Sequence, residues 1–137
     1  MLSTNQIDAL LAYAQLCAPN EMCGLMFPNE GFVGINNVSP DRTRSFQIAH
    51  DDYVRFSAMV RETAWAIVHS HPDRGASPSV KDCRLMDALQ VAQQDLAMVI
   101  VGLQPVEIRV FKKNVDLYRL VWSWAHKPAD ADEEVKA

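Results

Sequence analysis

Two histidines separated by one residue are the feature of this sequence best suited to chemistry. His69 and His71 end a short apolar run, and Pro72 follows directly and stops the strand that this run predicts. In a strand, residues i and i+2 point to the same face, about 6.6–7 Å apart along the backbone. Two imidazoles so placed can bind one metal ion through one nitrogen each. We expect the pair at a sheet edge or mouth rather than deep in the core.

A carboxylate that can complete this site follows in the next predicted element. Ser79 is expected to cap a helix, which places Asp82 in the first helical turn. The connection from His71 to Ser79 contains Pro and Gly, so the helix start can fold back over the strand end. Three protein ligands and one open position characterise a catalytic zinc site, where the pKa of water falls toward 7. Two histidines and a carboxylate would also tolerate cobalt or iron.

A site of this kind also needs a proton acceptor that does not hold the metal. Glu21 lies just before a predicted strand, Cys23 to Phe27, and fits this role if that strand neighbours the one ending at His69. Ser79, beside the metal, can donate a hydrogen bond to a developing oxyanion. The same Ser-x-x-Asp spacing is also a plain helix-capping pattern, and the two roles are compatible.

These residues resemble the JAB/MPN metalloproteases, the JAMM family. The motif is His-x-His, seven residues, Ser79, two residues and Asp82, with Glu21 upstream. The resemblance covers residues 1 to about 112 and implies an α/β fold of the JAB/MPN (cytidine deaminase-like) type, a mixed β-sheet flanked by helices.

The resemblance also implies an activity and a role for each residue. His69, His71 and Asp82 correspond to the zinc ligands, Glu21 to the general base and Ser79 to the oxyanion stabiliser. The implied enzyme is a zinc metallopeptidase in which water attacks a peptide or isopeptide carbonyl. In this family the cleaved bond often follows the carboxy-terminal Gly of a ubiquitin-like protein. A non-catalytic MPN scaffold is the alternative, although such domains usually lose a ligand.

In detail the chain is similar to two bacterial branches of the family. The segments CAPNEMCGLMF and VHSHP resemble the amino-terminal domain of phage tail assembly proteins of the lambda K type. The Pro78-Ser79 pair resembles standalone prokaryotic JAB peptidases, which act on ubiquitin-like and sulfur-carrier proteins. The phage proteins carry a second, NlpC-type cysteine-peptidase domain, which this sequence does not include. We therefore expect a protein substrate, either a ubiquitin-like protein or a phage tail component.

The hydrophobic pattern predicts alternating helices and strands. The predicted order is a helix from Ser3 to Cys17, strands over 23–27, 32–38 and 46–49, a helix over 51–63, a strand over 64–69, a helix over 79–94, and strands over 96–101 and 106–111. Asp51 or Asp52 is expected to cap the second helix. Residues 115–125 fit either a strand or a helix.

Length and composition predict one domain. The chain has 137 residues, of which we assign 1–126 to the JAB/MPN domain and 127–137 to an acidic disordered tail. A net charge of −4 argues against a nucleic-acid partner. The longest apolar stretch, Leu96 to Leu103, is far shorter than the roughly 20 residues of a membrane span. An odd count of three cysteines and the absence of a signal-type amino terminus indicate a cytoplasmic protein, and a homodimer is left open.

Cys23 offers an alternative chemistry. Its thiol and the His71 imidazole could form a nucleophile and base pair. A lone cysteine in a strand is more often a small core residue, which is the interpretation that we favour. His50 and His126 are expected at the surface without a role.

Overall fold

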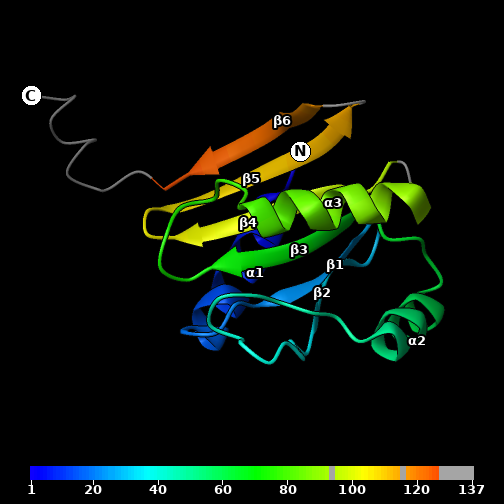
Figure 1. Cartoon of the computed structure of the whole chain (residues 1–137). Helices are drawn as coiled ribbons and strands as arrows, with labels where there is room; N and C mark the ends of the chain where they lie inside the picture. Colours follow the sequence, from blue (N-terminus) through cyan, green and yellow to red (C-terminus); the bar gives the residue numbers. More distant parts are fainter. Residues whose placement is uncertain (93–94, 115–116, 127–137) are drawn as a thin grey trace, which may run out of the picture.

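The computed structural model describes residues 1–92, 95–114 and 117–126 (Figure 1). The elements are α1 (Thr4–Cys17), β1 (Cys23–Phe27), β2 (Gly31–Ile35), α2 (His50–Val60), β3 (Ala66–His71), α3 (Val80–Ala92), β4 (Ala97–Leu103), β5 (Val106–Asn114) and β6 (Leu117–Ala125). The fold is α/β, as predicted. The proposed tail, 127–137, lies outside the described residues.

The strands form one mixed sheet in the order β2-β1-β3-β4-β5-β6. Strands β3 and β4 run parallel, and the other neighbouring strands run antiparallel. Cys23 of β1 pairs with His69 of β3, which confirms that the strand after Glu21 lies beside the histidines. His71 pairs with Gly102 of β4, so the end of β3 is enclosed by neighbours on both sides.

Helix α1 covers one face of the sheet (Figure 1). Leu10 and Ala14 of this helix pack against Val68 of β3 and Val99 of β4. The helix begins at the predicted place because Ser3 caps it. This face is an apolar core without chemistry.

Helix α3 covers the opposite face, where Met86 packs with Ile67, Met98 and Ile100. Side chains alternate along a strand, so Val68 faces α1 while Ile67 faces α3. The two residues of the His pair continue the series of Ile67 and therefore lie on the face that α3 covers.

Three boundaries differ from the predictions. Residues 46–49 do not form a strand, because Gln47 makes isolated hydrogen bonds, accepting from the Val38 N–H and donating to the Asn37 side chain, with no ladder. Strand β2 ends at Ile35 instead of residue 38. Strand β3 continues to His71, two residues beyond the predicted end. The extension matters because it makes both histidines part of one strand.

The predicted cap of α2 is wrong. Ala49 occupies the cap position and makes no side-chain cap hydrogen bond. Asp51 and Asp52 instead lie in the first turn, where negative charge interacts favourably with the positive end of the helix dipole. The open choice for residues 115–125 is resolved as a strand, β6, over the described part of that segment.

Two further expectations concern the cysteines and the membrane. The three cysteines are free thiols, in agreement with the prediction. Within the described residues, no helix combines the length and the apolar character that a membrane crossing requires.

Candidate metal centre

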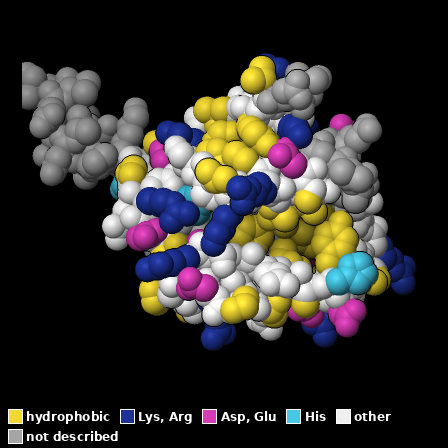
Figure 2. All heavy atoms as spheres, in the orientation of Figure 1, with side chains coloured by type: hydrophobic (Ala, Val, Ile, Leu, Met, Phe, Trp, Pro, Cys, Tyr) yellow, Lys and Arg dark blue, Asp and Glu magenta, His cyan; other side chains and the backbone are white. Residues whose placement is uncertain are grey.

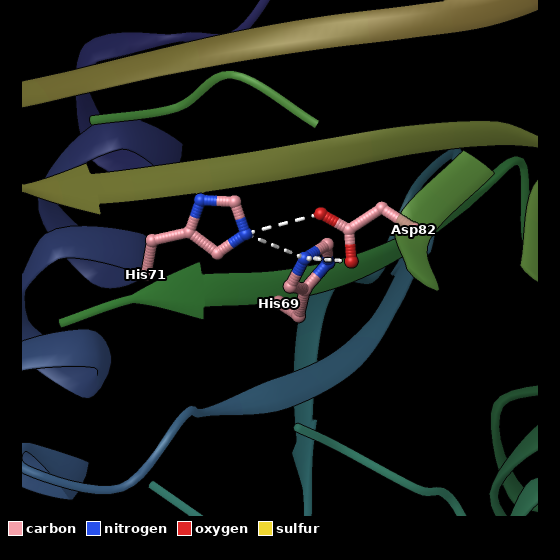
Figure 3. Close-up of side chains that lie close together, drawn as sticks. All are labelled: His69, His71 and Asp82. Carbon is pink, nitrogen blue, oxygen red and sulfur yellow. Dashed lines mark hydrogen bonds and ion pairs between the residues drawn. The ribbon is translucent and has the colours of Figure 1, made fainter. Parts of the chain in front are cut away.

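Three side chains converge at the carboxy-terminal end of β3 (Figure 3). The Nε2 atoms of His69 and His71 lie 3.2 Å apart. Asp82 places Oδ1 3.0 Å from Nε2 of His69 and Oδ2 3.1 Å from Nε2 of His71. The three candidate ligand atoms all lie within 4.8 Å of one another. Two imidazole nitrogens and a carboxylate so arranged form a ligand set suited to a divalent metal ion.

The start of α3 positions the carboxylate. The Asp82 N–H donates to Oγ of Ser79 at 3.1 Å, and the Ser79 N–H donates to Oδ2 of Asp82 at 2.9 Å. This reciprocal pair is a capping box with Asp in the third helical position. Ser79 therefore caps the helix as predicted, and the cap directs Asp82 toward the His pair.

A backbone carbonyl sets the tautomer of His71. Its Nδ1 lies 2.9 Å from the carbonyl oxygen of Gly75, which can only accept a hydrogen bond. In the neutral ring, Nδ1 then carries the proton and Nε2 presents a lone pair, as in metal-bound histidines with an outer partner. Two acceptors, Nε2 of His71 and Oδ2 of Asp82, consequently face each other at 3.1 Å. This contact is favourable only with a proton or a metal cation between the two atoms.

The second imidazole is held by stacking. The ring of His69 lies against Phe46 with centroids 4.4 Å apart and an angle of 19° between the planes. Its Nδ1 is buried and has no hydrogen-bond partner among the described residues. Nε2 is thus the atom of His69 that contacts the other two residues, Asp82 and His71.

The site is more deeply buried than we predicted. Both histidines are fully buried, and Asp82 is 5% exposed. The expectation of a sheet edge or mouth is wrong because β3 is an internal strand and α3 covers its end. The sequence shows the end of the strand but not what covers it.

Burial also sets the charges of the group. Burial lowers the pKa of His69, which favours the neutral ring. Burial alone would raise the pKa of Asp82, but the two adjacent imidazoles hold this pKa well below its usual range. The group is therefore a carboxylate with at least one neutral imidazole, and metal binding requires such deprotonated ligands. The residues fit a divalent metal.

Glu21 lies beside this group, just before β1, and is 3% exposed. Its N–H donates to the Arg42 carbonyl at 2.7 Å, and the Asn37 side chain donates to the Glu21 carbonyl at 3.0 Å. The next residue, Met22, exchanges hydrogen bonds with Ser70 of β3, which lies between the two histidines. Burial raises the pKa of Glu21 to about 7, in the range suited to proton transfer near neutral pH.

A small pocket of about 130 Å³ brings the predicted residues together. Glu21, Ser79 and Asp82 all line it. The Ser79 hydroxyl accepts the Asp82 N–H, which leaves the hydroxyl proton available to a bound molecule. The structure thus gathers all five predicted site residues, and the roles of Glu21 and Ser79 stay predictions.

The structure disfavours Cys23 as a nucleophile. Its thiol is fully buried and donates to the Ile35 carbonyl at 3.4 Å. Burial raises the pKa of this thiol to about 12, so the reactive thiolate is scarce at neutral pH. Cys23 is a core residue. His50 and His126 are both exposed, as predicted.

Three supporting residues were missed from the sequence. Gly75 orients His71, Phe46 stacks on His69, and Ser70 joins β3 to the segment that carries Glu21. Ser70 carried a usable signal, because it alternates with the two histidines and must face the other side of the sheet. Gly75 and Phe46 carried none, since their contacts depend on how two loops fold.

Comparison with known proteins agrees with this geometry. Residues 3–114 match the family of prokaryotic homologues of the JAB domain. The tail tip assembly protein K of Escherichia phage N15 is 36% identical over 85 residues, which cover 60% of this chain and 34% of that protein. The chain thus matches about a third of the length of this relative.

A solved structure supports the fold. The solution structure of protein DSY2949 from Desulfitobacterium hafniense matches with a TM-score of 0.67, 24% identity and 86% coverage of both chains. At this identity the match supports the fold alone. The family match, which spans most of the chain, goes further: this protein belongs to the prokaryotic JAB domain family.

Proposed function

We propose that this chain is a zinc-dependent peptidase of the JAMM type that hydrolyses a peptide or isopeptide bond. The observation that carries the proposal is the contact between Nε2 of His71 and Oδ2 of Asp82, two acceptors that require a cation between them. His69 supplies the third ligand. Membership of the JAB family supports the same assignment.

The chain's own residues would supply the proton transfers. A metal bound here would act as a Lewis acid that polarises the substrate carbonyl and lowers the pKa of water. Glu21 would accept the proton of the attacking water and deliver it to the leaving amine, consistent with its burial and its pKa of about 7. Ser79 would donate its hydroxyl to the oxygen on which negative charge develops.

Two classes of substrate follow from the resemblances. One is a ubiquitin-like or sulfur-carrier protein cleaved after its carboxy-terminal Gly. The other is a phage tail component, which the similarity to a tail tip assembly protein favours. The genes beside this one discriminate between them: tail genes support the second class, and genes for ubiquitin-like proteins and their activating enzymes support the first.

A non-catalytic scaffold is the competing role. Such a domain has no need of metal ligands, yet here His69, His71 and Asp82 are all retained and converge. Glu21 also lies in the adjoining pocket. The complete set of groups therefore favours catalysis over a scaffold.

Metal content and peptide cleavage test the proposal directly. We expect about one zinc per chain by mass spectrometry and cleavage of a Gly-Gly fusion or a tail-protein peptide. His71→Ala should lose both, whereas His126→Ala, an exposed histidine outside the site, should keep both. A wild-type protein that binds no metal, or binds it and cleaves neither substrate class, would contradict the proposal.

A further inference from the structure

Three cationic side chains surround the candidate metal centre. Arg44, Arg74 and Lys81 line the same pocket of about 130 Å³ as Glu21 and Asp82, and we call them the cationic rim. All three are exposed and come from three separate segments: the loop before α2, the loop after β3 and the first turn of α3. Figure 2 shows Lys and Arg side chains gathered on this face of the molecule.

The rim opposes the charge of the whole chain. The protein carries a net charge of −4, yet three cations and two carboxylates line this pocket. Within the described part of the chain, Arg44 and Lys81 make no ion pair, and Arg74 pairs only with its exposed neighbour Asp73, at 3.1 Å. A bound divalent metal would add further positive charge. The pocket is therefore electrostatically prepared for an anion rather than for a neutral peptide alone.

The opposite side of the pocket is apolar. A groove of about 420 Å³ shares Phe46 and Leu85 with the pocket and continues along Leu25, Ile67 and Leu89. Figure 2 shows this groove as a hydrophobic hollow beside the cationic side chains. An anionic group placed there would lose hydration without gaining a partner. The asymmetry leaves the cationic rim as the favourable place for a charged group on the substrate.

We propose that the cationic rim recognises a carboxylate of the substrate next to the scissile bond. The inference rests on the proposed peptidase function and specifies its substrate class. The carboxylate is either an Asp or Glu side chain or the free carboxy terminus of a short leaving group. Arg44 and Arg74 can each bind a carboxylate in a bidentate manner, and Lys81 adds a mobile point charge.

Matched peptides test this recognition. The set shares Leu-Gly-Gly and differs in the next residue and terminus: Glu with an amidated end, Gln with an amidated end, and Gln with a free carboxylate. Binding is measured by fluorescence anisotropy to zinc-loaded Glu21→Gln, which provides a readout besides turnover, and kcat/KM is measured with the wild type. We expect the carboxylate peptides to bind and react about tenfold better than the neutral one.

Variants identify the groups responsible. Arg44→Gln combined with Lys81→Gln should reduce the preference to about twofold or less, and raised salt should weaken it. The matched control is Lys112→Gln, an exposed cation beyond the Phe111–Met98 pair, at the other end of the sheet from the Gly102–His71 pair. This control should keep the full preference. The preferred carboxylate peptide distinguishes a side-chain carboxylate from a terminal one.

The outcomes separate the two proposals. Equal binding and equal kcat/KM for all three peptides, or no detectable binding of the carboxylate peptides, would overturn recognition by the rim. Cleavage without a preference would do so while leaving the peptidase proposal intact. Preferential binding without cleavage by the zinc-loaded wild type would support the rim and contradict the peptidase function.

Discussion

Helices α1 and α3 begin with the same hydrogen-bonding motif in different surroundings. At α1, the Gln6 N–H donates to Ser3 Oγ at 3.1 Å and the Ser3 N–H donates to Gln6 Oε1 at 2.9 Å. At α3, Ser79 and Asp82 make the same two bonds at the same distances. The first motif is exposed at the molecular surface, whereas Asp82 is buried against the His pair.

The difference shows what a local motif can and cannot determine. In both helices the spacing sets where the third residue of the helix points. Only at α3 does the sheet place imidazoles opposite that side chain, and only there is the side chain an acid. The capping box therefore positions Asp82, while β3 decides what it can bind. Substitutions matched between the two helices can separate these contributions.

The largest expected contrast is the loss of metal. Asp82→Ala removes one of three ligands, so metal affinity should fall by more than the roughly 10–100-fold that loss of an outer partner costs. Gln6→Ala removes the equivalent side chain at α1 and should keep full metal content, with a stability loss of about 1 kcal/mol or less. Mass spectrometry of dialysed protein measures the first effect and thermal unfolding the second. Stoichiometric metal in Asp82→Ala would show that the carboxylate only caps the helix.

The second contrast is between a ligand and a base. Glu21→Gln keeps the shape of the side chain and leaves the three ligands in place, so metal content should be unchanged. Turnover should fall by about 10²–10⁴-fold, because a general base contributes on this scale. Comparison of kcat with zinc occupancy in the same preparation checks the result. Full activity in this variant would remove Glu21 from the mechanism.

The two capping serines provide a third contrast. Ser3→Ala and Ser79→Ala each remove a hydroxyl that accepts a helix N–H, and each should cost about 1 kcal/mol of stability. Only Ser79 lines the pocket, so only its variant should also lower kcat, by about 100-fold, with little change in KM. Stability and steady-state kinetics are measured side by side. Equal kcat values for the two variants would reduce Ser79 to a cap.

The sequence was sufficient to predict features that depend on local patterns. The capping box at Ser3, the strand at Cys23–Phe27 and the shared face of His69 and His71 all follow from spacings of a few residues. The link from Asp82 to the His pair also needed the family resemblance. These predictions are confirmed because each depends on periodicity that tertiary structure preserves.

Other features depend on contacts between distant segments and could not be predicted. The residues over 46–49 are apolar enough for a strand, but they have no strand to pair with along a ladder. Asp51 could have capped α2, but the helix begins one residue earlier. The full burial of His71 results from α3 and from the Gly75 loop. Such outcomes are set by packing, about which a single sequence says little.

The pH dependence of stability sharpens the comparison between the two buried acids. In metal-free protein the pKa of Glu21 is raised from 4.5 to about 7, so the folded state binds this proton more tightly than the unfolded state. The resulting stability is present below pH 4.5 and is lost as the pH rises toward 7. Glu21→Gln avoids this loss and should gain stability relative to the wild type over that range, by about 3 kcal/mol.

Denaturant unfolding with a chelator, at pH 4.5 and pH 8, measures this difference. Asp82 has the opposite shift, a lowered pKa, so its contribution is lost as the pH falls through its folded value. It cancels in the comparison because both proteins retain Asp82. A stability difference that does not change with pH would mean that Glu21 is not buried as an acid.

The smallest expected effect comes from giving α1 the acid that α3 has. Gln6→Glu keeps the reciprocal cap and adds a negative charge in the first turn, which should stabilise the protein by about 0.3–1 kcal/mol. No histidine pair faces this carboxylate, so the variant should bind no additional metal. Thermal unfolding and metal titration check both expectations. A second metal equivalent in this variant would mean that a capping acid is sufficient for binding, and that the imidazoles of β3 are not what distinguishes α3 from α1.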